Sequence, residues 1–279
     1  MNTPIWVEPV VHGTWALLFL LFGPVRRGIL MNLRAILPHS NRGMNLFRAW
    51  RVLWNYAWTI ADASRYRYLR TLPDWEFVGL HYFEELCASP AGAIILTAHM
   101  GSYDLGAELF TETTSRRMVM VRAPEVEPST REYEESLLRE APVAGLKVDF
   151  SSKASEMAFD LLASVQNGDI VAIQGDRVTP GIATHPGKLF GVRTEFPAGP
   201  FALAMAARVP IYPMFILRVA RRRYRLVTCA PIEVRRTGRN RDEDLQNAID
   251  AWSAQLETVI RTGWYQWFAF EPYSPELAA

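Results

Sequence analysis

The clearest hydrophobic pattern in the chain lies between about Arg42 and Leu69, where apolar residues recur three and four positions apart. This spacing is typical of one face of an α-helix. We therefore predict a long helix over this range and expect most of its aromatic residues to be buried. The face consists of Phe47, Trp50, Leu53, Trp54, Ala57, Trp58 and Ala61.

Further along the chain, short apolar runs alternate with helical segments. Strands are predicted at 94–97, 117–124, 145–150, 169–176, 211–219 and 223–234, and helices at 104–111, 129–140, 154–168, 199–208 and 242–262. Strands separated by helices favour an α/β fold with a largely parallel, mixed sheet. We expect a single such domain over 41–279, flanked by helices, with a hydrophobic interfacial segment over 1–40.

Within that first segment, an apolar stretch from Trp15 to Phe22 ends at Gly23-Pro24 and is followed by Arg26 and Arg27. It is shorter than the roughly 20 apolar residues needed to span a bilayer. No charged region precedes it, so it is a poor signal peptide. We interpret it as an interfacial helix with a basic collar. A helix buried against the domain is the alternative, and the two interpretations are compatible.

Charge and cysteine content narrow the functional classes. A formal net charge of +1 gives no bulk basicity for nucleic-acid binding. Arginines cluster at 221–225 and 235–241, either as a solvated face or as a patch for anionic lipid or an acidic partner. The only cysteines, Cys87 and Cys229, form no disulfide framework, which fits a reducing compartment.

Candidate chemistry begins in the stretch AIILTAHMGSYDLGAELF, at 93–110. His99 follows a predicted strand, Gly101 permits a sharp turn, and Asp104 falls in the first turn of the next helix. Ligands gather at the carboxyl ends of strands in open α/β sheets. A carboxylate that orients the imidazole would make His99 a general base toward an alcohol. The alternative is a capping His99 and an ordinary helix-start charge at Asp104.

Other chemistries find less support. The Gly-x-Ser-x-Gly turn of serine hydrolases is missing from the sequence, as are His-Glu-x-x-His and Cys/His clusters. A metal site built from His99, Asp104, Asp176 and His185 has no supporting spacing. We therefore expect neither a metal nor a cofactor.

A second candidate region follows the next buried strand, which ends at Gln174-Gly175. Asp176 and Arg177 open a loop with several glycines and prolines, and such loops tend to carry function. Arg177 has the planar fork that binds a phosphate or a carboxylate. Asp176, Arg177 and Lys188 are therefore candidate substrate-binding residues. An Asp-Arg turn with a surface ion pair is the alternative.

Six stretches, taken in order, resemble the bacterial lipid A biosynthesis (late) acyltransferase family of the lysophospholipid acyltransferase-like superfamily. They are MNLRAILP, TAHMGSYDL, VAIQGDR, LFGVRTEFPAGPFALA, VPIYPMFILR and WYQWF, and the resemblance covers about Trp15 to Phe270. It implies a glycerol-phosphate-acyltransferase-like fold. His99 matches the catalytic His of the family's HX4D motif and Asp104 its acidic partner.

The resemblance also implies a function. The protein would be an O-acyltransferase bound peripherally or monotopically to the cytoplasmic face of the inner membrane. Its donor would be an acyl thioester on acyl carrier protein or coenzyme A, and its acceptor a hydroxyl of a lipid or glycolipid. Asp104 stands where the family often has Glu, and Gly-Asp-Arg replaces an Asp-Gln loop. These departures leave the acceptor open between a lipid A precursor and a related glycolipid.

The chemistry assigns roles to the remaining candidates. A tetrahedral oxyanion needs donors nearby, for which Gly101, Ser102 and Arg177 are candidates. Arg122, at the end of the following strand, would bind a phosphate of donor or acceptor, or else form a strand-end ion pair. A catalytically silent lipid-binding protein, or a thioesterase or lipid esterase on the same fold, is the alternative function.

Overall fold

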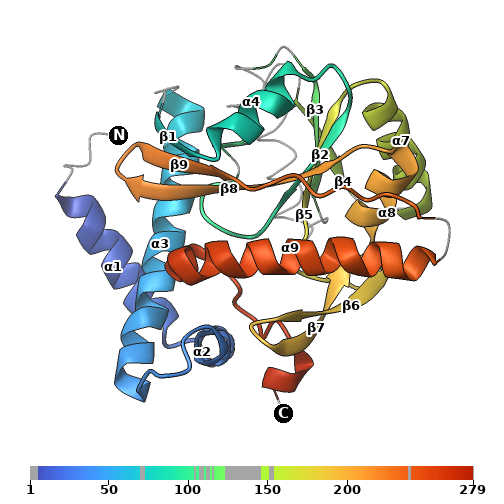
Figure 1. The fold of residues 1–279 in the computed structure, drawn as a ribbon. Helices are drawn as coiled ribbons and strands as arrows, with labels where there is room; N and C mark the ends of the chain where they lie inside the picture. The colour runs from blue at the N-terminus through green and yellow to red at the C-terminus, as the bar shows by residue number, and fades with distance from the viewer. Residues whose placement is uncertain are drawn as a thin grey trace.

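The computed structural model describes residues 6–69, 73–103, 105–106, 110, 114, 116–122, 146–150, 154–237 and 240–278 (Figure 1). The elements in chain order are α1 Val7–Phe19, α2 Gly23–Ile36, α3 Arg42–Leu69, β1 Asp74–Val78, α4 Leu80–Ala88, β2 Ala93–Thr97, β3 Met118–Arg122, β4 Leu146–Phe150, α7 Ala154–Gln166, β5 Ile170–Gln174, β6 Thr184–Leu189, β7 Val192–Pro197, α8 Gly199–Ala207, β8 Ile211–Ala220, β9 Arg223–Thr228 and α9 Arg241–Gly263. Two 3-10 turns follow, Trp264–Gln266 and Pro275–Leu277.

The main sheet has seven strands in the order β1-β9-β8-β2-β5-β3-β4. Five of the six neighbouring pairs are parallel, and β8 with β9 is antiparallel. The predicted α/β fold with a largely parallel mixed sheet is confirmed. Strands β2 and β5 lie side by side near its centre, so their carboxyl ends meet at one edge.

Helices cover both faces of this sheet. One face packs against α7, α8 and α9, with Trp252 of α9 fully buried and stacked on Phe215 of β8. The other packs against α4, through Phe83 and Leu86, and against the end of α3. Because β2 is buried on both faces, it is a continuous apolar run rather than an alternating one.

One prediction for the region after β5 was wrong. The segment interpreted as a long loop contains the antiparallel hairpin β6–β7, with its turn at Phe190 and Gly191. Both turn residues have positive φ, 52° and 79°, as a two-residue hairpin turn requires. Pro186 and Gly187 interrupt the apolar alternation and so conceal the strand. The helix predicted over 129–140 lies outside the described residues, as does most of that over 104–111.

The helices α1 and α2 pack on α3 around a separate cluster that includes Ala16, Leu33 and Leu53. The outer face of α1 and the turn after it expose large apolar side chains: Trp6, Val10, Val11, Leu17, Leu18, Leu21 and Phe22. In the described part of the chain, no single helix is long and apolar enough to cross a bilayer. Only α1 and α2 together meet that test of length and composition, as a pair bent by 97°.

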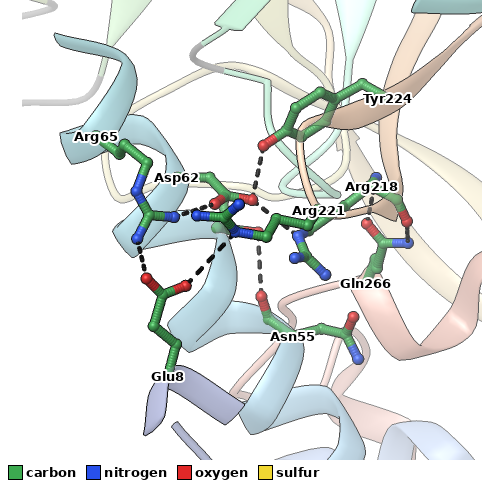
Figure 2. A network of polar contacts seen from close by, with 9 residues as sticks. Glu8, Asn55, Asp62, Arg65, Arg218, Arg221, Tyr224 and Gln266 are labelled. Carbon is green, nitrogen blue, oxygen red and sulfur yellow. Dashed lines mark hydrogen bonds and ion pairs between the residues drawn. The ribbon is translucent and has the colours of Figure 1, made fainter. Parts of the chain in front are cut away.

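A buried polar network joins α1 to α3 and the sheet (Figure 2). Arg65 of α3 pairs with Glu8 of α1. Asp62 of α3 accepts hydrogen bonds from Nε of Arg218 on β8 (2.8 Å) and from the hydroxyl of Tyr224 on β9 (2.7 Å). The network fixes the position of the N-terminal helices relative to β8, beside which the candidate site lies.

Candidate active site

His99 lies two residues beyond β2, at the carboxyl edge of the sheet. The chain turns sharply after it, and Gly101 adopts a φ of 59°. A Cβ at this position would lie 1.9 Å from the carbonyl oxygen of Ile216 on β8, so only glycine fits. The turn therefore holds the His99 backbone against β8.

Asp176 is the direct partner of His99. The Oδ1 atom of Asp176 lies 2.8 Å from Nδ1 of His99 and 3.1 Å from its backbone nitrogen. Thr97 and Gln174, the last residues of β2 and β5, are paired in register. His99 lies two residues after Thr97, and Asp176 lies two residues after Gln174. Neighbouring parallel strands thus bring together residues that are 77 positions apart. We call His99 and Asp176 the dyad.

The Asp176 carboxylate is fully enclosed, whereas 29% of the His99 side chain is exposed. Burial alone would raise the pKa of Asp176. Attraction and hydrogen bonding to His99, the charge of Arg177 and the Trp267 hydrogen bond outweigh burial and hold the pKa well below its usual value. Asp176 is therefore ionised at neutral pH and accepts a hydrogen bond from the Nδ1–H of His99, which leaves Nε2 as the basic nitrogen.

Residues 266–268, just after α9, form hydrogen bonds to both residues of the dyad and to Gly101. The indole nitrogen of Trp267 donates to Oδ2 of Asp176 over 2.9 Å. The backbone nitrogen of Phe268 donates to the His99 carbonyl over 2.8 Å, and that of Gly101 donates to the Gln266 carbonyl over 2.8 Å. We call residues 266–268 the clamp.

The clamp is itself fixed by two side chains. The Gln266 amide bonds both the backbone nitrogen and the carbonyl of Arg218, so the clamp is tied to the network of Figure 2. Arg177 donates from Nη2 to the Phe268 carbonyl. The Arg177 guanidinium thus connects the loop after β5 to the clamp, and its predicted role in substrate binding stays a prediction.

Other predicted site residues lie elsewhere or have different contacts. The backbone nitrogen of Ser102 donates to the carbonyl oxygen of Ile216 over 2.8 Å, and that of Gly101 donates to the carbonyl oxygen of Gln266. Neither backbone amide is therefore free to bind an oxyanion in this conformation. Lys188 is exposed on β6, and its carbonyl accepts from Ser253. Asp104 lies outside the described residues.

Arg122 ends β3 and pairs through its backbone register with Phe150 of β4. Its side chain lies outside what the structure describes, so its predicted phosphate contact stays a prediction. The arginine cluster at 221–225 forms ion pairs within the protein: Arg221 with Glu8 of α1, and Arg223 and Arg225 with Glu76 of β1. That pairing lowers the pKa of Glu76, chiefly through the Arg225 hydrogen bond.

An apolar pocket adjoins the dyad on the α4 side of the sheet. The cavity has a volume of about 50 Å³ and is partly open to solvent. Tyr103 lines the pocket, and its ring centre lies 6.3 Å from that of His99. The wall consists mainly of Ile95, Phe110, Met118, Met120, Met214, Ile216 and Leu226, with Thr97 and Gln174 as polar members.

Two parts of this site were missed by sequence reasoning. The sequence analysis assigns Asp176 to substrate binding rather than to the partnership with His99, although a signal is present: both predicted strands end within two residues of a titratable side chain. The Trp267 contact had no local signal, because an aromatic residue near 267 is as typical of a core as of a site.

A comparison with protein families identifies the family to which the chain belongs. The model of the bacterial lipid A biosynthesis acyltransferase family matches residues 13–273. The chain belongs to this family. A comparison with curated proteins finds no match. The protein is therefore an acyltransferase of lipid A biosynthesis, which acts with an acyl donor and a lipid acceptor.

Within the described ranges of this acyltransferase, no three His, Cys, Asp or Glu side chains come together in a way that would hold a metal ion. His185, a member of the metal set considered above, lies on β6 and contacts the Pro186 carbonyl over 3.2 Å. The dyad of the acyltransferase thus consists of an imidazole and a carboxylate.

Proposed function

We propose that the protein transfers an acyl group from a thioester to a hydroxyl of a lipid A precursor or related glycolipid, with His99 as general base and Asp176 as its partner. The observation that carries the proposal is the 2.8 Å contact between Nδ1 of His99 and the buried, ionised Asp176 carboxylate. This contact orients the ring and stabilises the imidazolium that forms during transfer.

The proposed step is direct transfer without an acyl-enzyme. The acceptor hydroxyl gives its proton to Nε2 of His99, and its oxygen bonds to the thioester carbonyl carbon. The carbon–sulfur bond then breaks, and the proton passes from the imidazolium to the departing sulfur. General-base assistance contributes about 10²- to 10⁴-fold. Nε2 makes no hydrogen bond within the described residues, and the partial exposure of the ring leaves it accessible.

The apolar pocket is the proposed site of the acyl chain. Its wall is almost wholly hydrocarbon and sulfur, and it adjoins His99 through Tyr103. A chain inserted here would place its thioester carbon at the end of the pocket next to Nε2. The donor carrier, acyl carrier protein or coenzyme A, would remain outside the pocket.

We further propose that the protein binds the cytoplasmic face of the inner membrane through α1. The exposed apolar side chains of α1 and its following turn are contiguous along one helix face. Exposed large apolar patches mark interaction surfaces. Arg27 and Arg34 on the following helix α2 are exposed, which suits anionic headgroups. Such seating would bring a lipid acceptor to the protein without a spanning helix.

The test is a transfer assay with labelled dodecanoyl thioesters of both carriers and, as acceptors, a lipid A precursor or total inner-membrane lipid. Wild-type protein should form labelled lipid, and His99→Ala should lose at least about 10²-fold in rate at an unchanged melting temperature. Labelled free fatty acid without acyl-lipid would instead indicate a thioesterase. A folded His99→Ala protein that keeps more than about a tenth of the rate contradicts the general-base role.

A further inference from the structure

Three buried polar atoms near the dyad have no hydrogen-bond partner within the described residues. They are Oγ of Ser102, Nε2 of Gln174 and Nε of Arg177. Each belongs to a residue within three positions of His99 or Asp176. Buried polar groups in native proteins are nearly always hydrogen-bonded. An unpaired buried donor beside the dyad is therefore a candidate to bind an acceptor atom of the substrate.

Gln174 differs from the other two because it also lines the apolar pocket. It is the last residue of β5 and pairs in register with Thr97, the last residue of β2. Since alternate residues of a strand share a face, the Gln174 side chain lies one pleat before Asp176, at the end of the pocket nearest the dyad. The pocket thus carries a buried amide donor where an inserted acyl chain would begin.

We propose that Nε2 of Gln174 binds the carbonyl oxygen of the acyl thioester and stabilises the negative charge that develops there during attack. The inference rests on the proposed acyl transfer and adds a catalytic residue to it. The carbonyl oxygen is the polar atom that enters the site with the chain. The backbone amides of Gly101 and Ser102 are already bonded, whereas Nε2 of Gln174 is an unpaired donor. Gln174 neither gains nor loses a proton in this role.

The first arm of the test removes the donor and keeps the shape. Gln174→Leu should lower kcat by about 10²- to 10³-fold, the effect of losing one oxyanion donor. KM for the acyl donor should change little, and the melting temperature should hold or rise because an unpaired polar group is gone. Gln174→Glu, of the same length but ionised, should lose at least as much. Gln246→Leu makes the same change on α9, outside the pocket and the dyad, and should keep near-normal kcat.

The second arm measures binding without turnover. It compares a dodecyl thioether, which has no carbonyl, with a ketone analogue in which a methylene separates the carbonyl from sulfur, both on the carrier that supports transfer. Wild-type protein should bind the ketone analogue more tightly, and Gln174→Leu should bind the two equally.

The outcomes separate the two proposals. Active wild-type protein together with a fully active Gln174→Leu variant, or an unchanged preference for the ketone analogue in that variant, overturns the role of Gln174 alone. Wild-type protein that transfers no acyl group from either carrier overturns the proposed function, and the role of Gln174 with it.

Discussion

The indole nitrogen of Trp267 lies 2.9 Å from Oδ2 of Asp176, although the two residues are 91 positions apart. This contact and the 2.8 Å contact to His99 engage both oxygens of one carboxylate. Trp267 therefore determines how Asp176 faces the imidazole. In the proposed mechanism Trp267 is a positioning residue.

Replacement of this indole tests that role. Trp267→Phe removes a hydrogen bond to a buried, charged acceptor, an interaction worth about 1.5–3 kcal/mol. We expect kcat to fall about tenfold or more while KM for both substrates stays within about twofold, because the loss affects proton transfer rather than binding. The measurement is steady-state kinetics with each substrate varied in turn.

Trp252→Phe is the matched control. Its indole is also buried and donates to a backbone carbonyl, that of Gly175, over 3.1 Å. Both variants should melt at lower temperature than wild type, but only Trp267→Phe should lose kcat. Equal losses of kcat in the two variants would show that Trp267 acts only through stability.

The identity of the carboxylate that serves His99 can be decided by comparing two variants. Asp176→Asn keeps the shape but removes the charge that stabilises imidazolium. We expect it to lower kcat by about 10²-fold or more. The sequence motif instead predicts that role for Asp104. A larger kcat loss for Asp104→Asn than for Asp176→Asn would favour the motif over the observed contact.

Acid stability depends on the same group. Because the folded pKa of Asp176 lies below the value of about 3.9 for an unperturbed Asp, the unfolded chain takes up its proton more readily. The stabilisation from ionised Asp176 is therefore complete above the unfolded pKa and declines as pH falls below it toward the folded pKa. The melting-temperature difference between wild type and Asp176→Asn should shrink from about pH 6 to about pH 3. A difference independent of pH would contradict the lowered pKa.

Membrane binding is tested at exposed positions of the N-terminal helices. Leu21→Ser combined with Phe22→Ser should weaken binding to anionic vesicles by about a hundredfold or more, since each buried apolar side chain contributes about 1.5–3 kcal/mol. Leu21 is 73% exposed, so stability should change little. Phe159→Ser on α7, also at a highly exposed position (75%), is the control and should bind vesicles like wild type. Equal vesicle binding by all three proteins would end the assignment of α1 as the membrane contact.

These point variants are preferable to deletion of residues 1–28. The deletion removes α1 and part of α2, which cover the cluster around Leu53 of α3. It also removes Gly28, which lies so close to the Phe270 carbonyl that a Cβ would come within 2.0 Å. A truncated protein would therefore lose packing as well as any membrane contact.

The fold was predictable because hydrophobic periodicity reports local structure. The run at 94–97 predicted β2, and the spacing from Phe47 to Ala61 predicted α3. The β6–β7 hairpin was missed because Pro186 and Gly187 break its apolar alternation. An element was predicted correctly where the hydrophobic pattern of its own residues was regular, and missed where that pattern was interrupted.

The site was predictable only in part. His99 was found because it directly follows a buried strand. Its contact with Asp176 depends on the order of strands in the sheet, and that of Asp176 with Trp267 on the path of the chain after α9. The order of strands and the path of the chain after α9 depend on residues far apart in the sequence. A motif within a few residues of His99 therefore could not identify Asp176 as its partner.

The clamp also has a consequence for the order of events during synthesis. β2 emerges from the ribosome first, β5 follows, and residues 266–268 come 91 residues or so after Asp176. A nascent chain that already contains His99 and Asp176 still lacks the indole and the backbone groups that hold them. The complete dyad geometry is thus available only after nearly all of the 279 residues have been made.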